Sequence, residues 1–89
     1  MILLVSYDLK VPGRDYTKLY ETLKSASSWW HYLESTWLLS TNDPIETWSD
    51  KIHAAIDAND IFFIVDITGK PYSGWLPPKA WEWIQQQNR

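Results

Sequence analysis

Two short segments of the chain, residues 2–8 and 61–67, are apolar at most positions and carry β-branched side chains. In the first segment both alternating sets of side chains are apolar: Ile2 and Leu4 in one set, and Leu3, Val5 and Tyr7 in the other. A strand that is apolar on both faces is usually central in its sheet and covered on both sides. The two segments therefore predict the core strands of a sheet that needs a cover on each face.

The sequence between these strands predicts a helix followed by a hairpin. Residues 14–26 place apolar side chains at helical spacing and leave charged ones outside: Lys18, Glu21 and Lys24. Residues 29–33 and 35–40 are two aromatic or β-branched runs joined at Glu34, each too short for an independent helix. We interpret them as a tight hairpin or as one strand with a sharp bend.

A second helix is predicted to begin near residue 43. Asp43 can cap it, Pro44 suits the first helical position, and Glu46 stands where the acid of a capping box would lie. Apolar residues at helical spacing continue to Ala58, and Asn59 is a plausible stop.

The expected order of elements is β-α-β-β-α-β, followed by a Trp-rich tail with a short helix over residues 79–87. This order is the signature of the ferredoxin-like fold of the α+β class, in which the crossovers are right-handed. A chain of 89 residues has room for one core. We expect residues 1–68 to form the ferredoxin-like domain, and residues 69–89 to form an extension packed on that domain or on a dimer partner.

Composition excludes several classes of function. The chain has no cysteine, which rules out disulfides, thiolate zinc sites and a cysteine nucleophile. Its net charge of −3 provides no general electrostatic attraction for nucleic acid. The first apolar run is far shorter than the roughly 20 residues of a membrane span, so we expect a cytoplasmic protein without membrane association.

The predicted topology gathers polar residues at one rim of the sheet, where the first strand ends and the third and fourth begin. The residues expected there are Asp8, Lys10, Arg14, Glu34, Ser35, Asn59 and Asp60. Carboxylates without cysteine suit a hard cation such as Mg²⁺, which could activate water and shield a phosphodiester. Asp8 and Asp60 are the candidate metal ligands, and Lys10 and Arg14 are the candidate phosphate-binding residues. The alternative is that these charges are an ordinary solvated surface.

The residues at this rim also carry a resemblance. Residues 3–9 (LLVSYDL), an Arg-containing helix and residues 34–39 (ESTWLL) resemble the small CRISPR-associated endonuclease of spacer acquisition and the related virulence-associated protein D ribonucleases. The resemblance covers residues 1–67. Residues 29–31 (WWH) and 35–38 (STWL) are more similar still to small bacterial proteins described as SinR-like.

The resemblance implies a homodimer in which two copies of Asp8 face each other across the two-fold axis. It also implies a phosphodiesterase that depends on Mg²⁺ or Mn²⁺ and acts on RNA or DNA. Asp8 is then the principal catalytic residue, and Ser35 corresponds to the serine of the family's third strand. Members of the CRISPR family can also serve as dimeric scaffolds without using this chemistry.

The two histidines give little indication of a metal site, because they are far apart in the sequence. His53 is off the apolar stripe of its helix, so we expect it at the surface. His31 is a candidate general base on the second strand, but it falls short of the rim by roughly 10 Å of strand rise.

The seven tryptophans leave a second hypothesis open. Trp81 and Trp83 are two residues apart, so one helical face cannot bury both. Either the tail inserts between two layers, as in a dimer, or it exposes an aromatic side chain for a nucleobase or a protein partner. Under this hypothesis the chain is a non-catalytic dimeric interaction or scaffold module, and the candidate partner-binding residues are Trp75, Trp81 and Trp83.

Overall fold

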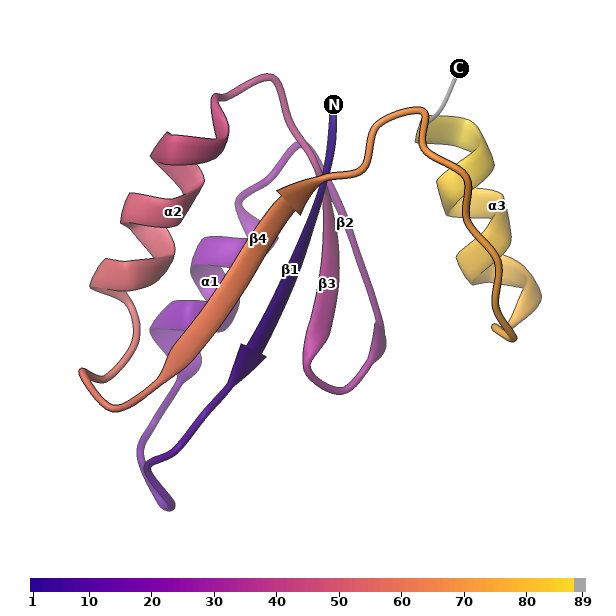
Figure 1. Ribbon diagram of the computed structural model, residues 1–89. Coiled ribbons are helices and arrows are strands. Elements are labelled where there is room, and N and C mark those ends of the chain that lie inside the picture. Colours follow the sequence, from indigo (N-terminus) through magenta and orange to yellow (C-terminus); the bar gives the residue numbers. More distant parts are fainter. Residues whose placement is uncertain (88–89) are drawn as a thin grey trace.

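The structure is a computed structural model that describes residues 1–87, and within them the chain forms a four-stranded antiparallel sheet and three helices (Figure 1). The strands are β1 (Ile2–Asp8), β2 (Ser28–Leu33), β3 (Thr36–Ser40) and β4 (Ile61–Asp66). The helices are α1 (Thr17–Lys24), α2 (Ile45–Ala54) and α3 (Pro78–Gln87). The predicted α+β class is confirmed, and the last two positions of the predicted extension lie outside the described residues.

The strands lie in the order β2-β3-β1-β4, and each neighbouring pair is antiparallel. β1 is central, as its apolar faces predicted: Leu4 lies opposite Leu38 on one side and opposite Val65 on the other. β2 and β3 form the predicted hairpin, with an irregular register between Trp30 and Leu33.

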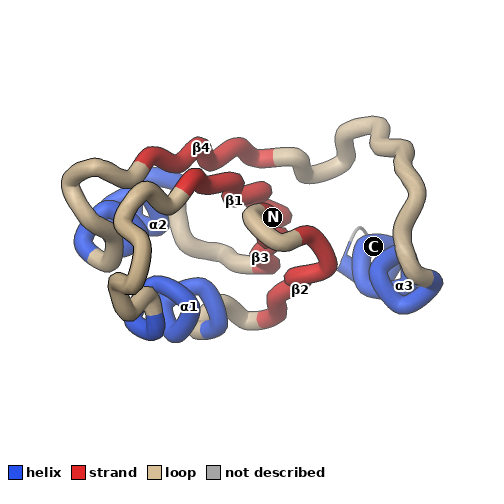
Figure 2. The backbone as a smooth tube through the Cα atoms, turned by 90° about the horizontal axis from the view of Figure 1, so that it is seen from below, coloured by secondary structure: helices blue, strands red, loops and turns tan. Residues whose placement is uncertain are grey.

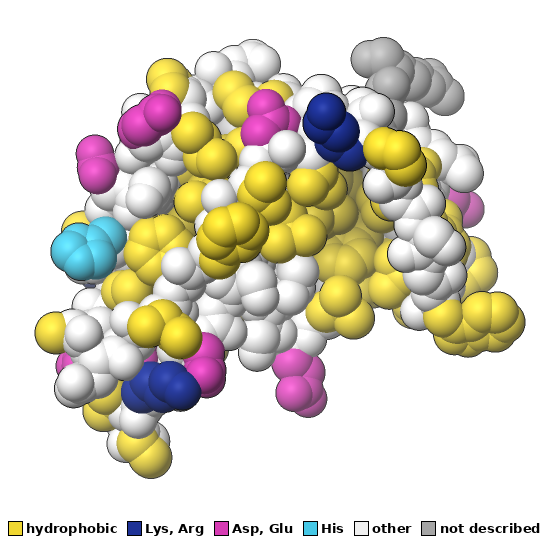
Figure 3. Space-filling view, in the orientation of Figure 1, with side chains coloured by type: hydrophobic (Ala, Val, Ile, Leu, Met, Phe, Trp, Pro, Cys, Tyr) yellow, Lys and Arg dark blue, Asp and Glu magenta, His cyan; other side chains and the backbone are white. Residues whose placement is uncertain are grey.

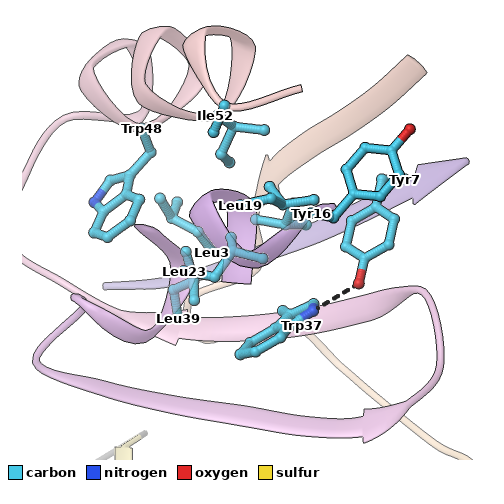
Figure 4. Close-up of a cluster of buried hydrophobic side chains, with 11 residues drawn as sticks. Leu3, Tyr7, Tyr16, Leu19, Leu23, Trp37, Leu39, Trp48 and Ile52 are labelled. Atoms are coloured by element: carbon cyan, nitrogen blue, oxygen red, sulfur yellow. Dashed lines mark hydrogen bonds between the residues drawn. The ribbon is translucent and has the colours of Figure 1, made fainter. Parts of the chain in front are cut away.

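Helices α1 and α2 cover one face of the sheet, whereas α3 lies on the other side (Figure 2). The larger core cluster fills the space between the sheet and the first two helices (Figure 4). Its fully buried members are Leu3, Val5, Leu19, Leu23, Trp37, Leu39, Trp48 and Ile52. Burying a side chain of this size contributes about 1.5–3 kcal/mol, so this cluster is the main source of stability.

We call the opposite side of the sheet the open face, and α3 covers the part of it nearest β2. Ile2, Trp30 and Leu38 of the sheet form a second buried cluster with Ala80 and Ile84 of α3. Two tryptophans fasten the helix: Trp30 Nε1–H donates to the carbonyl of Ala80 (3.3 Å), and Trp83 Nε1–H donates to Ser28 Oγ (2.7 Å). β1 is therefore covered on both faces near its beginning.

The first helix is shorter than predicted. Asp15 Oδ1 accepts hydrogen bonds from the backbone N–H (2.9 Å) and the hydroxyl of Thr17. This local turn competes with the helix at its start, so α1 begins at Thr17 rather than near residue 14.

The predicted cap of the second helix is wrong. The N-cap position of α2 is Pro44 in an extended conformation, and no side chain among the described residues caps it. Asp43 instead donates its backbone N–H to Thr41 Oγ1 (3.1 Å). The helix also ends before Ala58, at Ala54, because the chain turns into a loop held by hydrogen bonds to Asp60.

Candidate functional site

Asp8 ends β1 at the rim of the sheet, as predicted, and lies opposite Ile61 of β4. Its carboxylate is exposed and forms an ion pair with Lys10, in which Nζ and Oδ2 are 2.5 Å apart. An ion pair this open to water contributes little to stability. The structure thus brings together a candidate metal ligand and a candidate phosphate-binding residue, each neutralising the other's charge.

Asp60 lies at the same rim but is almost buried, with 8% of its surface exposed. Its Oδ1 accepts from the backbone N–H of Lys10 (2.6 Å) and the hydroxyl of Tyr16 (2.9 Å), and its Oδ2 accepts from the backbone N–H of Asp57 (2.8 Å). Burial by itself would raise the pKa of Asp60, but these hydrogen bonds outweigh it and lower the pKa. The carboxylate therefore joins the β1–α1 loop to the α2–β4 loop, and these three hydrogen bonds leave one lone pair, on Oδ2, for the predicted role as a metal ligand.

Arg14, the other predicted phosphate-binding residue, is held against the second of these loops. Its Nη1 lies 3.1 Å from Asp57 Oδ2, and its guanidinium stacks 5.5 Å above the ring of Tyr16. A guanidinium has five N–H donors, so the pairing with Asp57 leaves others for a ligand. Lys10 and Arg14 thus belong to one loop, which Asp60 and Asp57 anchor.

Ser35 lies in the exposed turn of the β2–β3 hairpin, and its backbone contacts the end of β1. Its carbonyl accepts from the backbone N–H of Tyr7 (3.1 Å), which docks the turn against the end of β1. Beneath the turn, Trp37 Nε1–H donates to the hydroxyl of Tyr7 (3.0 Å; Figure 4). Burial raises the pKa of Tyr7 despite this hydrogen bond, so the phenol is held in its neutral form.

The structure places the two histidines away from Asp8. The ring of His31 stacks on Trp37 with centroids 3.9 Å apart, and its Nε2 lies 3.0 Å from the carbonyl of Glu34. Trp37 belongs to the core beneath α1 and α2, whereas Asp8 follows Tyr7 and so points to the opposite face. His53 is exposed on α2, as predicted.

The described residues contain no large cluster of metal-ligating side chains. Among residues 1–87, no three His, Asp or Glu side chains come close enough together to hold an ion. Asp8 offers one exposed carboxylate, and Mg²⁺ can be held by one or two carboxylates with water in its other positions. The exposed Asp8 carboxylate could therefore serve as one ligand of such an ion.

Beside Asp8, the open face carries exposed apolar side chains on β4. Ile61 and Phe63 are 59% and 65% exposed, and they lie opposite Asp8 and Ser6 of β1 in a shallow depression. We call Ile61, Phe63 and the half-buried Val65 the β4 patch. No described element covers the patch, so Asp8 borders an apolar surface that is exposed to solvent.

A groove of about 270 Å³ lies between the sheet and the segment that leads to α3, where the space-filling view shows a hollow lined by hydrophobic side chains (Figure 3). Leu4 and Leu38 line it on the sheet side, and Tyr72, Leu76 and Trp81 line it on the other. Lys70 is the one charged side chain among the described residues that line the groove. The groove could not be predicted from the sequence, because apolar residues in separate segments carry no pattern that places them on opposite sides of a groove.

The structure separates the three tryptophans predicted to bind a partner. Trp81 stacks on Tyr72 with centroids 5.9 Å apart, and Trp83 is hydrogen-bonded to Ser28. Trp75, in contrast, is 99% exposed on the segment between β4 and α3. Trp75 is thus the member of the three that is presented to solvent.

Comparisons of the chain with protein-family models, with curated proteins and with solved structures found no match. Within residues 1–87, none of the helices has the length and apolar character needed to span a membrane. Fold and site therefore define the class directly: a small α+β domain whose antiparallel sheet leaves an apolar face exposed next to Asp8.

Proposed function

We propose that this protein is a non-catalytic homodimeric interaction or scaffold module of ferredoxin-like topology, assembled through the open face of its sheet. Two features support the topology. The first six elements follow the order β-α-β-β-α-β, and the strand order is β2-β3-β1-β4. Helix α1 connects β1 to β2, which have β3 between them in the sheet, and α2 connects β3 to β4, which have β1 between them. This is the arrangement of a split βαβ unit.

The exposed β4 patch carries the proposal of a dimer. The helical side of the sheet is covered by α1 and α2, and α3 covers the open face near β2, but the patch has no cover among the described elements. Large contiguous apolar surfaces on soluble domains usually mark interfaces. A second copy that places its own patch here would bury both, as a two-fold interface does.

The test is to place a charge in the patch. Phe63 is mostly exposed, so Phe63→Asp should leave the fold intact while burying a carboxylate in any interface formed there. We expect the wild type to sediment as a dimer and the variant as a folded monomer, with melting temperatures that agree at concentrations where the wild-type dimer has dissociated. His53→Asp, on the helical side, is the matched control and should remain dimeric. A wild type that is monomeric at millimolar concentration, or a Phe63→Asp variant that still dimerises, would refute the proposal.

A second candidate function is a phosphodiesterase that depends on Mg²⁺ or Mn²⁺ and acts on RNA or DNA. The observation that favours it is the position of Asp8, which is exposed and borders the β4 patch. If two patches meet near a two-fold axis, the two Asp8 carboxylates approach each other and could share a metal that activates water. Lys10 and Arg14 lie on the adjoining loop, where they could hold a phosphate.

This candidate is tested by cleavage of single-stranded and duplex RNA and DNA with each metal. Asp8→Asn should abolish cleavage without changing the oligomeric state or the melting temperature. Asp50→Asn, an exposed carboxylate of α2, is the control and should cleave like the wild type. Absence of cleavage by the wild type with either metal would exclude this candidate and leave the scaffold proposal standing.

A further inference from the structure

A fully exposed indole and an unfilled apolar groove occur side by side in this chain. Trp75 is 99% exposed, whereas Trp30, Trp37 and Trp48 are 1–2% exposed. A large aromatic side chain can bury about 150–250 Å², and an exposed one does not gain the stabilisation that this burial provides. Tryptophan is one of the residue types most often found as the anchor of a protein interface.

The segment around Trp75 holds the indole away from the chain's own groove. Ser73 and Leu76 line the groove, and a Cβ at Gly74 would lie 3.8 Å from the ring of Trp81. Pro71 and Pro77 restrict the backbone at either end of the segment. The indole is therefore displayed by a segment whose backbone two prolines restrict, which lowers the entropy lost when it binds.

We infer that Trp75 of one copy inserts into the groove of a second copy, and that the second copy's Trp75 inserts into the groove of the first. This inference rests on the proposed dimer and names the contact that completes it. In a two-fold dimer a contact between two different sites on the chain occurs twice, so one chain needs both an anchor and a receptor. The neutral indole matches a groove whose lining has a single charge at Lys70, and it can donate its N–H to a polar group at the rim.

The area of the contact agrees with this arrangement. Two indoles of about 150–250 Å² each, together with similar areas of the two grooves, bury roughly 600–1,000 Å². A stable interface buries about 1,200–2,000 Å² in total, so the anchors alone are insufficient. The β4 patch lies on the same face as the groove, since Val65 of the patch pairs with Leu4 of the groove lining. The β4 patch therefore supplies further apolar area to the same interface.

The first experiment measures dimer dissociation of the full chain by sedimentation equilibrium. Trp75→Ala should raise the dissociation constant about 100- to 1,000-fold, because two anchors are lost at once. Trp75→Phe should recover part of the loss, and Lys79→Ala, an exposed change on α3, should have no effect. Since Trp75 is exposed, its replacement should leave the melting temperature unchanged at concentrations where the wild-type dimer has dissociated. A Trp75→Ala dimer as tight as the wild type would overturn the inference.

The second experiment identifies the receptor. Ser73 is exposed and lines the groove, so Ser73→Trp should fill the groove from its own chain and weaken the dimer as Trp75→Ala does. A photo-crosslinker at position 75 should join residues of the groove lining in the other copy, as read by mass spectrometry. Crosslinks to another surface would refute the receptor, and an unaffected Ser73→Trp dimer would do the same.

The two proposals fail in different ways. If Phe63→Asp is monomeric while Trp75→Ala remains a tight dimer, the proposed dimer stands and the anchor inference is wrong. If the wild type is a monomer at every concentration, both are wrong.

Discussion

The hydrogen bond between Trp37 and Tyr7 gives the sharpest prediction about stability, because it joins the two strands that form the rim beside Asp8. The indole N–H of Trp37 is buried, and the hydroxyl of Tyr7 accepts its hydrogen bond. Every buried side-chain nitrogen and oxygen among the described residues has a partner. Tyr7→Phe keeps the ring in place and removes only the acceptor, so it leaves one buried donor without a partner.

The expected cost follows from that orphaned donor. An unsatisfied buried polar group costs about 1–3 kcal/mol, and the hydroxyl's own 3.5 Å contact with the Glu34 carbonyl is too long to add much. For a domain of this size, 2 kcal/mol corresponds to a fall in melting temperature of about 8–16 °C. The total stability of such a domain is about 5–15 kcal/mol, so the effect is a substantial part of it.

The assay is urea unfolding followed by tryptophan fluorescence, with the free energy extrapolated to water. Tyr32→Phe is the matched control, because Tyr32 is 45% exposed and its hydroxyl can bond to water. The control should stay within about 0.5 kcal/mol of the wild type. A Tyr7→Phe variant as stable as the control would refute the reasoning, and it would mean that water or another acceptor reaches the Trp37 indole.

Two further predictions concern buried polar groups. Thr41 is 5% exposed, and its Oγ1 accepts from the indole N–H of Trp48 (3.0 Å) and the backbone N–H of Asp43 (3.1 Å). Thr41→Val should therefore lower the free energy of unfolding in urea by about 1–3 kcal/mol. An unchanged free energy of unfolding would contradict this prediction. The folded pKa of Asp60 is lowered below its unfolded value of about 3.9, so its stabilisation is present above that pH and is lost as the pH falls through the folded pKa. The melting temperature of Asp60→Asn, measured from pH 7 to pH 2, should be lower than the wild type's at neutral pH and approach it in acid; parallel curves would refute this role.

The strands could be predicted from the sequence because a short run of apolar, aromatic and β-branched residues is a strong and local signal. The predicted bounds of β1 agree with the structure, and those of β2, β3 and β4 differ from it by one residue at one end. The central position of β1 also followed, since a strand apolar on both faces needs two neighbours and two covers. The helix ends could not be predicted as well, because they depend on competing short-range hydrogen bonds, such as the one between Asp15 and Thr17.

The candidate site was predicted only in outline. The predicted topology placed Asp8, Lys10 and Asp60 at one rim, where the structure also has them, because strand order and direction determine which segment ends meet. It could not indicate which carboxylate would be buried. That depends on three donors, two of them backbone N–H groups of loops whose conformations have no sequence pattern, and these donors take both oxygens of Asp60.

The different surroundings of Asp8 and Asp60 also decide the order of the experiments. Asp60 accepts three hydrogen bonds and ties two loops together, so replacing it perturbs the fold before it tests any chemistry. Asp8 is exposed and bonded only to another exposed side chain, Lys10, in the ion pair described, so its replacement tests chemistry with little effect on folding. If cleavage uses a metal shared by two copies of Asp8, as in the second candidate function, it depends on the dimer formed at the β4 patch. Phe63→Asp should therefore abolish the dimer and any cleavage together, whereas Asp8→Asn should abolish cleavage alone. A Phe63→Asp monomer that still cleaved would show that the chemistry lies elsewhere in the chain.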